Sequence, residues 1–427
     1  MTTRVLTKDA HVDQSRIRIE HDQGNQRLTH RTLPTLEERL TGCLVGTAVA
    51  DSLGLPYEGL SRSRAAKILG PADRHRFVFG RGMVSDDTDH ICMVAQALIF
   101  ANGDLAKFQI NFARRLKYWF ATLPAGVGIA TAKSCLKLWF FSSPQTSGVF
   151  SAGNGPAMRA AIFGAYFDDI QQLQEFLKAA TVVTHTDPKA YHGAIAVALA
   201  AMLGRQNQHV KGDQFLQLYS ATVTDAHDEL LPKLKQAVDS VRQGETVLEF
   251  AAELGCHQKV SGYVLETVPM AIHAWLSHQR DYRSAVTSII ACGGDADTTA
   301  AIVGGIVGAT VGANQIPEKW RANVIEWPRT LSWIRRLGHR LATAEKEPTA
   351  QKKPPRLSVS AVLIRNVIFL LIVLVHGFKR LLPPYEKRCF KHRISTATAA
   401  EQDSNQSDSD KTHGRFLQLE CQDLPND

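Results

Sequence analysis

The chain has 427 residues, of which 44% are hydrophobic and 21% charged, and its formal net charge is +8. This composition excludes a mainly disordered, collagen-like or polytopic membrane protein, and the length predicts two or three domains with a substantial core. The small positive excess suggests an anionic partner without identifying one, and nucleic acid is not indicated.

The seven cysteines are widely scattered and form no CxxC pair. An odd number without a spacing pattern predicts neither a disulfide framework nor a zinc ribbon, and it favours a reducing compartment. The N-terminal sequence MTTRVLTKDAHVDQSRIRIE has no apolar stretch of the kind that a secretory signal requires. Together these features predict a cytoplasmic protein.

Composition divides the chain into five segments. Residues 1–35 are polar and contain the breaker Pro34, which predicts a flexible N-terminal arm. Residues 36–345 carry long Ala/Leu/Val/Ile runs at helical spacing and few alternating runs, so they predict a mainly helical core domain. A charged, proline-containing linker follows at 346–357, then an apolar helix with basic flanks at 358–394, and a disordered polar tail at 395–427.

The run AAIVGGIVGATVGA at 300–313 is apolar enough to suggest a membrane span. It is only fourteen residues long, and acidic residues lie just upstream, so a buried core helix is the better prediction. Gly304, Gly308 and Gly312 recur every four residues and therefore share one face, where another helix can approach closely.

Two acidic clusters each precede an apolar, helix-like run. The first is SDDTD at 85–89 and the second is GGDADTT at 293–299. Ser, Thr and Asp are favoured at helix starts, so either cluster alone is explained by capping. Capping needs only one or two such residues, however, and the pair of clusters suits a hard cation with oxygen ligands, such as Mg²⁺ or Mn²⁺, better than zinc.

Three further elements each have a simpler structural explanation when taken alone. GTAVADSLGLPYEGL at 46–60 holds Glu58 in a Gly/Pro turn, where a solvated loop carboxylate is ordinary. SAGNGPAMR at 151–159 is a glycine-rich loop that can turn backbone N–H groups toward phosphate, although it is not a Walker loop. THTDP at 184–188 places His185 before a helix, where histidine is more often structural than catalytic.

Taken together and in this order, the five elements resemble the ADP-ribosylglycohydrolase family. The resemblance rests on GxxxADSLGxPYE, SDDTD, GNGxxMR, THTDPxAxxGAxAxA and GGDADTTAAIxGxIxGA, and it covers about residues 36–340. It implies an all-α fold, an orthogonal helical bundle with a binuclear metal cleft that holds two Mg²⁺ or Mn²⁺ ions.

The resemblance also implies roles for individual residues. The metal ligands would be Ser85, Asp86, Asp87, Asp295, Asp297 and Thr298, with Ser85 standing where the family usually has Thr. Substrate contacts would come from Gly153, Asn154, Gly155 and His185, with Tyr263 packing on the nucleotide. Catalysis would fall to Glu58, Asp86 and Asp297, and which of these carboxylates acts as the base stays open.

The implied activity is hydrolysis of the C1″ glycosidic bond of ADP-ribose attached to a protein side chain or a small conjugate, which releases ADP-ribose. The transition state of such a reaction resembles an oxocarbenium ion, so nearby anions stabilise it. One alternative is a non-catalytic relative that binds ADP-ribose or is structural, which would be expected to have lost metal ligands. Another is a membrane-tethered adaptor that works through its C-terminal segment.

The apolar stretch from Val359 to Phe378 is interrupted by Arg365 and Asn366 and has Lys and Arg on both sides. A charge within a span is costly, and positive charge at both ends gives no orientation. The pattern therefore favours an interfacial or re-entrant segment on an anionic membrane surface, through residues 358–394, over one that crosses it. The remaining alternative is an extra helix docked on the core.

Overall fold

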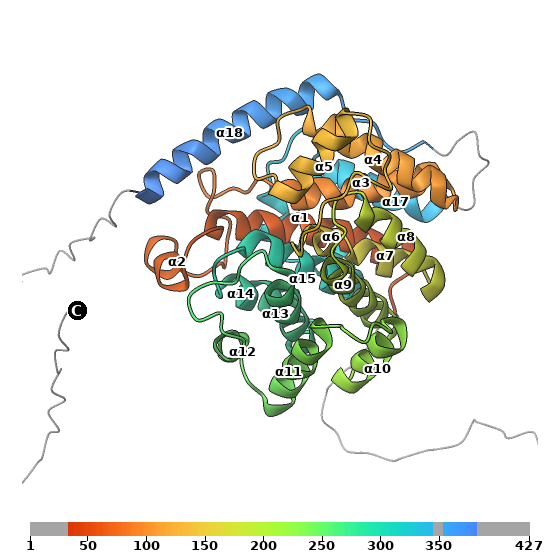
Figure 1. Cartoon of the computed structure of the whole chain (residues 1–427). Helices are drawn as coiled ribbons and strands as arrows, with labels where there is room; N and C mark the ends of the chain where they lie inside the picture. Colours follow the sequence, from red (N-terminus) through yellow and green to blue (C-terminus); the bar gives the residue numbers. More distant parts are fainter. Residues whose placement is uncertain (1–32, 345–352, 382–427) are drawn as a thin grey trace, which may run out of the picture. The chain divides into compact units, whose positions relative to one another are not determined.

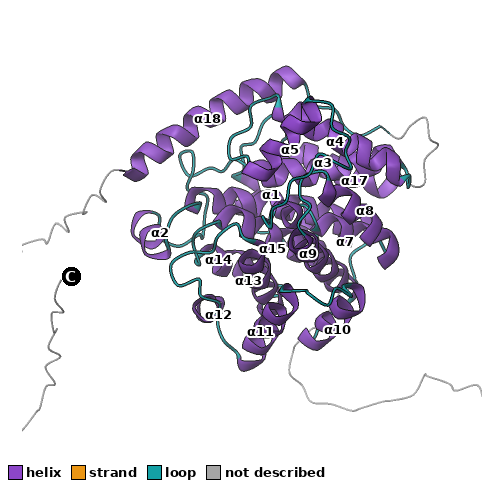
Figure 2. Cartoon of the chain, viewed as in Figure 1, coloured by secondary structure: helices purple, strands orange, loops and turns teal. Residues whose placement is uncertain are grey.

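The computed structural model describes residues 33–344 and 353–381. Within these ranges the chain folds into helices joined by loops, and its only β-type pairings are isolated bridges (Figures 1 and 2). The predicted all-α class is therefore confirmed. The predicted arm, linker and polar tail lie wholly or mostly outside the described residues.

The helices are joined by connections of very different lengths, of which those between α2 and α3 and between α5 and α6 are long. In chain order they are α1 Leu36–Gly54, η1 Leu55–Tyr57, α2 Arg62–Ile68, α3 Asp86–Ala101, α4 Leu105–Phe120, α5 Ile129–Trp139, α6 Gly155–Met158, α7 Ala161–Tyr166, α8 Ile170–Val182, α9 Pro188–Gln206, α10 Gly212–Thr222, α11 Leu230–Gln243, α12 Val247–Glu253, α13 Val264–Ser277, α14 Tyr282–Ile290, α15 Ala296–Val311, η2 Ala313–Gln315, α16 Glu318–Ala322, α17 Leu331–Thr343 and α18 Val359–Leu381.

Helices α1 and α15 form the centre of the core, and both are buried along most of their length. They touch backbone to backbone, because a Cβ atom on Gly308 would lie 2.2 Å from the carbonyl oxygen of Gly42, and one on Gly304 would lie 2.5 Å from that of Gly46. The prediction of a core helix with a face for close approach is thus confirmed. Gly312 shares this face, because its Cα would lie 2.8 Å from a Cβ on Gly42, and it also ends α15 with a φ of 78° that favours glycine.

We expect Gly308→Ala to destabilise the fold by about 1–3 kcal/mol, because the added methyl group meets a backbone oxygen that cannot move aside without separating two core helices. Gly377→Ala in α18 is the matched control, since nothing lies within 4 Å of a Cβ there and alanine is the better helix former. Chemical denaturation of both variants measures the difference. Equal stabilities would contradict the close packing of α1 on α15.

The last described helix, α18, lies along the core (Figure 1) and contacts it through polar residues and the buried Phe369. Arg365 donates to both carboxylate oxygens of Glu326 at 2.7 Å, and Asn366 donates to the carbonyl oxygen of Thr122 at 2.9 Å. Of the helices described, α18 is the one long and apolar enough to cross a membrane by length and composition. The two residues that interrupt its apolar sequence are thus its docking contacts.

Candidate functional site

Two helix starts meet at one end of the core. Ser85 caps α3, because its hydroxyl accepts a hydrogen bond from the backbone N–H of Asp87 at 3.2 Å. Asp295 precedes α15, and three residues later the Thr298 hydroxyl donates to the carboxylate of Asp87 at 3.2 Å. This hydrogen bond joins the two acidic clusters that the sequence analysis singled out, which lie 211 residues apart in the chain.

A buried acidic residue of α1, Asp51, holds the start of α3 in place. Asp51 lies fully buried in α1, and its carboxylate accepts hydrogen bonds from the backbone N–H groups of Ser85 and Thr88 and from the Thr88 hydroxyl. Burial raises the pKa of Asp51 to about 7. Sequence reasoning gave Asp51 no role, although an acid inside an otherwise apolar helix is a signal that a buried partner exists.

The carboxylates of the two clusters are crowded and largely removed from water. Burial raises the pKa values of Asp86, Asp87 and Asp297 well above their ordinary range, and each is raised further by neighbouring carboxylates. Glu58 contributes to this repulsion at both Asp86 and Asp297, so it lies within electrostatic range of both helix starts. Negative charge is thus gathered on both sides of one cleft.

The donor set fits a hard cation. One carboxylate oxygen of Asp87 is buried and has no hydrogen-bond partner. Such an oxygen is costly to bury unless another group satisfies it, and oxygen-only donors suit Mg²⁺ or Mn²⁺. Within the described ranges, no three His, Cys, Asp or Glu side chains already converge as a formed metal centre. The fit therefore rests on the unsatisfied oxygen and on the chemistry of the donors.

The cleft has a volume of about 510 Å³ and opens above these carboxylates. Of the residues predicted from sequence, Glu58, Asp86, Gly153, Asn154, Gly155, His185, Asp295, Asp297 and Thr298 line it. Ser85 and Asp87 do not line the cleft and are 5% and 1% exposed. Tyr263 precedes α13 with 40% of its surface exposed, and it is not among the lining residues.

The glycine-rich loop is held directly against the second acidic cluster. The side-chain amide of Asn154 donates to the Asp295 carboxylate at 2.6 Å and to the Thr267 hydroxyl at 3.1 Å. Its backbone N–H donates to the carbonyl oxygen of Gly262. Asn154 therefore orients an acid of the site as well as lining the cleft.

His185 lies beneath this loop and explains the need for glycine there. A Cβ atom on Gly155 would stand 2.8 Å from a ring carbon of His185, so a side chain at 155 would displace the imidazole. Burial, with a smaller contribution from Arg159, lowers the pKa of His185 to about 3. The ring is consequently neutral at physiological pH, with Nδ1 within 2.9 Å of the Thr184 hydroxyl.

Several lining residues were given no individual role by the sequence analysis. Lys259 and Ser261 come from the loop before α13, and Ser151 from the start of the glycine-rich loop. Gly126 of the α4–α5 connection and Ile129, which begins α5, also line the cleft, and a Cβ on Gly126 would lie 3.5 Å from the Asp86 carboxylate. Lys259 is the one cation among the described lining residues, and no motif marks it.

Comparisons with known proteins agree with this arrangement. Residues 32–351 match the profile of the ADP-ribosylglycohydrolase family. The chain is 31% identical to an uncharacterized protein of Archaeoglobus fulgidus over 67% of this chain and 91% of that protein. It is 28% identical to the ADP-ribosylhydrolase ARH3 of Gallus gallus, with 66% and 88% covered.

Two further comparisons concern a second glycohydrolase and a solved structure. The ADP-ribosyl-[dinitrogen reductase] glycohydrolase of Rhodospirillum rubrum is 25% identical, over 68% of this chain and 91% of that enzyme. A solved structure described as an ADP-ribosylglycohydrolase-related protein complex aligns with a TM-score of 0.51 at 22% identity, covering 73% of this chain and 98% of that one. The structural similarity shows the fold.

Proposed function

Because this chain belongs to the ADP-ribosylglycohydrolase family, we propose that it is a metal-dependent hydrolase that cleaves the C1″ glycosidic bond of ADP-ribose on a protein side chain or a small conjugate. The observation that carries the proposal is the hydrogen bond from Thr298 to Asp87 at the floor of the cleft. It brings together two acid-bearing helix starts, and all six oxygen donors expected of a divalent-metal pair are present.

In the proposed site, Ser85, Asp86 and Asp87 from one cluster and Asp295, Asp297 and Thr298 from the other would hold the metal ions. Bound divalent ions would orient the ribose hydroxyls and lower the pKa of an attacking water. The surrounding carboxylates stabilise the positive charge that develops on the sugar ring in an oxocarbenium-like transition state.

Different residues of the chain would contact different parts of the substrate. Glu58 is exposed at the rim, at the end of η1, where it can accept a hydrogen bond from a ribose hydroxyl. The 151–155 loop and Lys259 offer N–H groups and a positive charge to the diphosphate. Asp86, Asp297 and Glu58 each remain a candidate for the base that takes the proton from water.

The alternative is a non-catalytic relative that binds ADP-ribose or is structural. The complete set of acids argues against it, because burying so many carboxylates opposes folding and a purely structural protein has no use for that cost. A binding protein would retain the cleft and its glycine-rich loop without turnover.

The test is release of free ADP-ribose by the full chain from peptides modified on arginine and on serine, with Mg²⁺, with Mn²⁺ and with EDTA. We expect release with a divalent ion and loss of it in EDTA that is restored when the ion is returned. The preferred peptide identifies the linkage. Absence of release from both peptides, despite measurable ADP-ribose binding, would favour the non-catalytic alternative, and release that EDTA does not affect would refute the metal dependence.

A further inference from the structure

Helix α18 has its polar residues inside and its apolar residues outside. Arg365, Asn366 and His376 all face the protein, where Arg365 pairs with Glu326 and His376 lies 2.7 Å from the carbonyl oxygen of Phe77. Phe369 is buried beside them. At 100° per residue these positions share one side of the helix. The docked side thus provides a partner for each of these three polar side chains.

Between Val359 and Phe378, the opposite side of α18 is largely apolar and carries no charged residue. Its exposed apolar side chains are Val359, Leu363, Ile364, Val367, Ile368, Leu370, Leu371, Leu374, Val375 and Phe378, with between 39% and 69% of each surface accessible. We call these ten residues the outward face. A continuous apolar face of this length is costly in water, and such faces on soluble proteins mark sites of interaction.

The two loops that α18 binds each add an exposed apolar side chain. Phe79, two residues beyond the His376 contact at Phe77, is fully exposed with a φ of 50°. Leu123, next to the Asn366 contact at Thr122, is 63% exposed with a φ of 55°. Bulky residues rarely adopt this left-handed conformation, and such outliers concentrate at functional positions.

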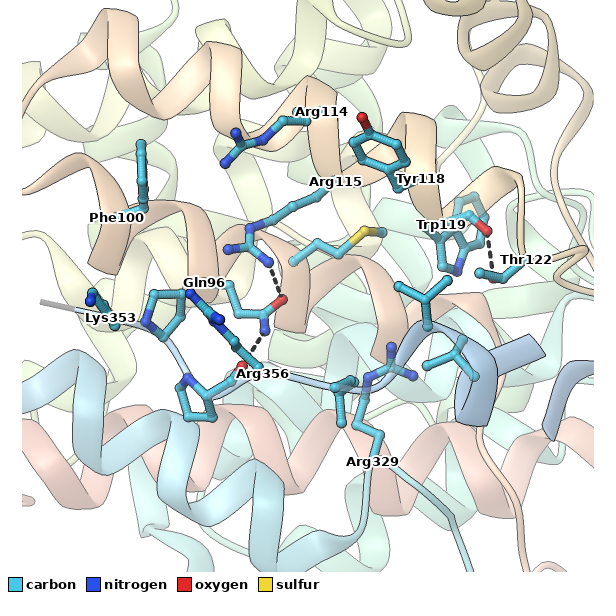
Figure 3. Close-up of a pocket in the computed structure, with 16 residues that line it drawn as sticks. Gln96, Phe100, Arg114, Arg115, Tyr118, Trp119, Thr122, Arg329, Lys353 and Arg356 are labelled. Atoms are coloured by element: carbon cyan, nitrogen blue, oxygen red, sulfur yellow. Dashed lines mark hydrogen bonds between the residues drawn. The ribbon is translucent and has the colours of Figure 1, made fainter. Parts of the chain in front are cut away.

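A cationic pocket lies at the N-terminal end of α18. Its volume is about 470 Å³, and Val359 and Val362 of α18 form part of its wall. Arg114 and Arg115 project into it from α4, with Lys353 and Arg356 on the other side (Figure 3). No acidic side chain is among the described residues that line this pocket.

The guanidinium groups of Arg114 and Arg115 repel each other. Arg115 donates to two neutral oxygens, that of Asn111 at 2.7 Å and that of Gln96 at 2.8 Å, the second of which is drawn in Figure 3. Burial and the neighbouring Arg114 lower its pKa to about 10. Arg329 also lines the pocket but is paired with Asp89. Four cations gathered around a cavity without a carboxylate suit an anionic group such as a phosphate.

We propose that α18 is a membrane-surface anchor whose outward face enters an anionic leaflet while the cationic pocket takes lipid phosphate. The combination of an uncharged face with cations at its end favours a bilayer over a protein partner or a second copy of the chain, whose interfaces have polar rims. The sequence after Phe378 is also basic. A span is disfavoured, because it would remove Arg365 from Glu326 and carry the charge into hydrocarbon.

This anchor is connected to the catalytic cleft. Arg365 donates to the carbonyl oxygen of Val84, which directly precedes Ser85, and Glu326 accepts the backbone N–H of Val84. Asn366 binds Thr122, in the connection that continues to Ile129 at the cleft. Membrane binding therefore holds the cleft in a set position relative to the bilayer. The proposal concerns location and does not depend on the proposed activity.

Flotation of the full chain with vesicles tests it. We expect binding to vesicles of phosphatidylcholine with phosphatidylglycerol and much weaker binding to phosphatidylcholine alone. Leu371→Glu/Leu374→Glu should weaken binding by at least about tenfold, because charge on the outward face opposes insertion. Arg114→Ala/Arg356→Ala should weaken it by about fivefold for each cation removed, which corresponds to about 1 kcal/mol per basic residue.

Matched substitutions far from α18 control for general effects. Leu248→Glu on α12 and Lys235→Ala/Arg242→Ala on α11 also alter exposed residues and should leave binding unchanged. Equal binding to both vesicle types would overturn the proposal, as would binding that survives the pocket variants. An absence of vesicle binding together with a dimer, detected by sedimentation and lost in Leu371→Glu/Leu374→Glu, would also overturn it and assign the face to a second copy.

Discussion

Asp297→Asn is expected to lower the rate of ADP-ribose release by about 10²–10⁴-fold, while the metal-free protein becomes more stable to heat. Activity falls because the substitution removes a carboxylate that the proposed site uses both for metal and as a candidate base. Stability rises because burial, Glu58 and the other carboxylates raise the pKa of Asp297. The folded protein must therefore either keep Asp297 protonated or bear the repulsion between its carboxylate and its neighbours. An asparagine at this position is uncharged and avoids both costs.

The sign of the pH effect follows from the raised pKa. Between the ordinary pKa of aspartate and the raised value in the fold, the folded chain binds more protons than the unfolded chain, so its stability falls as pH rises. The stability advantage of Asp297→Asn in EDTA should therefore grow as pH increases above about 4. Melting curves across a pH series measure it.

Asp213→Asn is the matched control, because Asp213 is exposed and paired with Arg242 at the surface of α10. It should retain activity and show no such pH-dependent gain. If Asp297→Asn keeps full turnover, Asp297 is not essential to catalysis. If it is destabilised in EDTA at every pH, the repulsion inferred among the buried carboxylates is wrong.

Arg365→Leu is expected to destabilise the fold by about 3–5 kcal/mol, the cost of leaving a buried carboxylate unpaired. Glu326 is 4% exposed, and Arg365 supplies its charge partner. The substitution makes the apolar stretch of α18 more hydrophobic. The same change would therefore stabilise α18 as a membrane span and destabilise it as a helix docked on the core. Chemical denaturation of the full chain in the absence of lipid measures the loss.

The double variant Arg365→Leu/Glu326→Gln separates loss of the pair from loss of packing. Removing the carboxylate's charge should restore much of the stability, because the remaining amide needs only hydrogen bonds from its surroundings. An Arg365→Leu protein as stable as the parent would show that α18 does not dock through this ion pair. In that case the argument that the Arg365–Glu326 pair keeps α18 from spanning a membrane would fail as well.

The fold class and the two acidic clusters were predictable because their signals are local. Helical spacing predicted a helical core, and acids directly before apolar runs predicted the helix starts that meet in the cleft. Asp51 was not assigned, since its hydrogen bonds to Ser85 and Thr88 depend on how α1 packs. Lys259 reaches the cleft from a loop whose path no periodicity describes.

The C-terminal helix shows a different limit of sequence reasoning. Arg365 and Asn366 were treated as a penalty against a membrane span, and the structure makes them hydrogen-bond donors to Glu326 and Thr122. A hydropathy pattern reports how apolar a stretch is but not toward which side its polar residues point. That direction depends on partners that are distant in the sequence.

The pairing of α1 with α15 also constrains how the protein is made. Gly42 and Gly308 lie near opposite ends of the core sequence, so α1 leaves the ribosome long before the helix that covers its buried face. During that interval its apolar surface needs a temporary cover, whether another helix of the nascent chain or a chaperone. A chain that stops before residue 296 lacks α15 altogether, and it would expose that surface permanently and be directed to degradation.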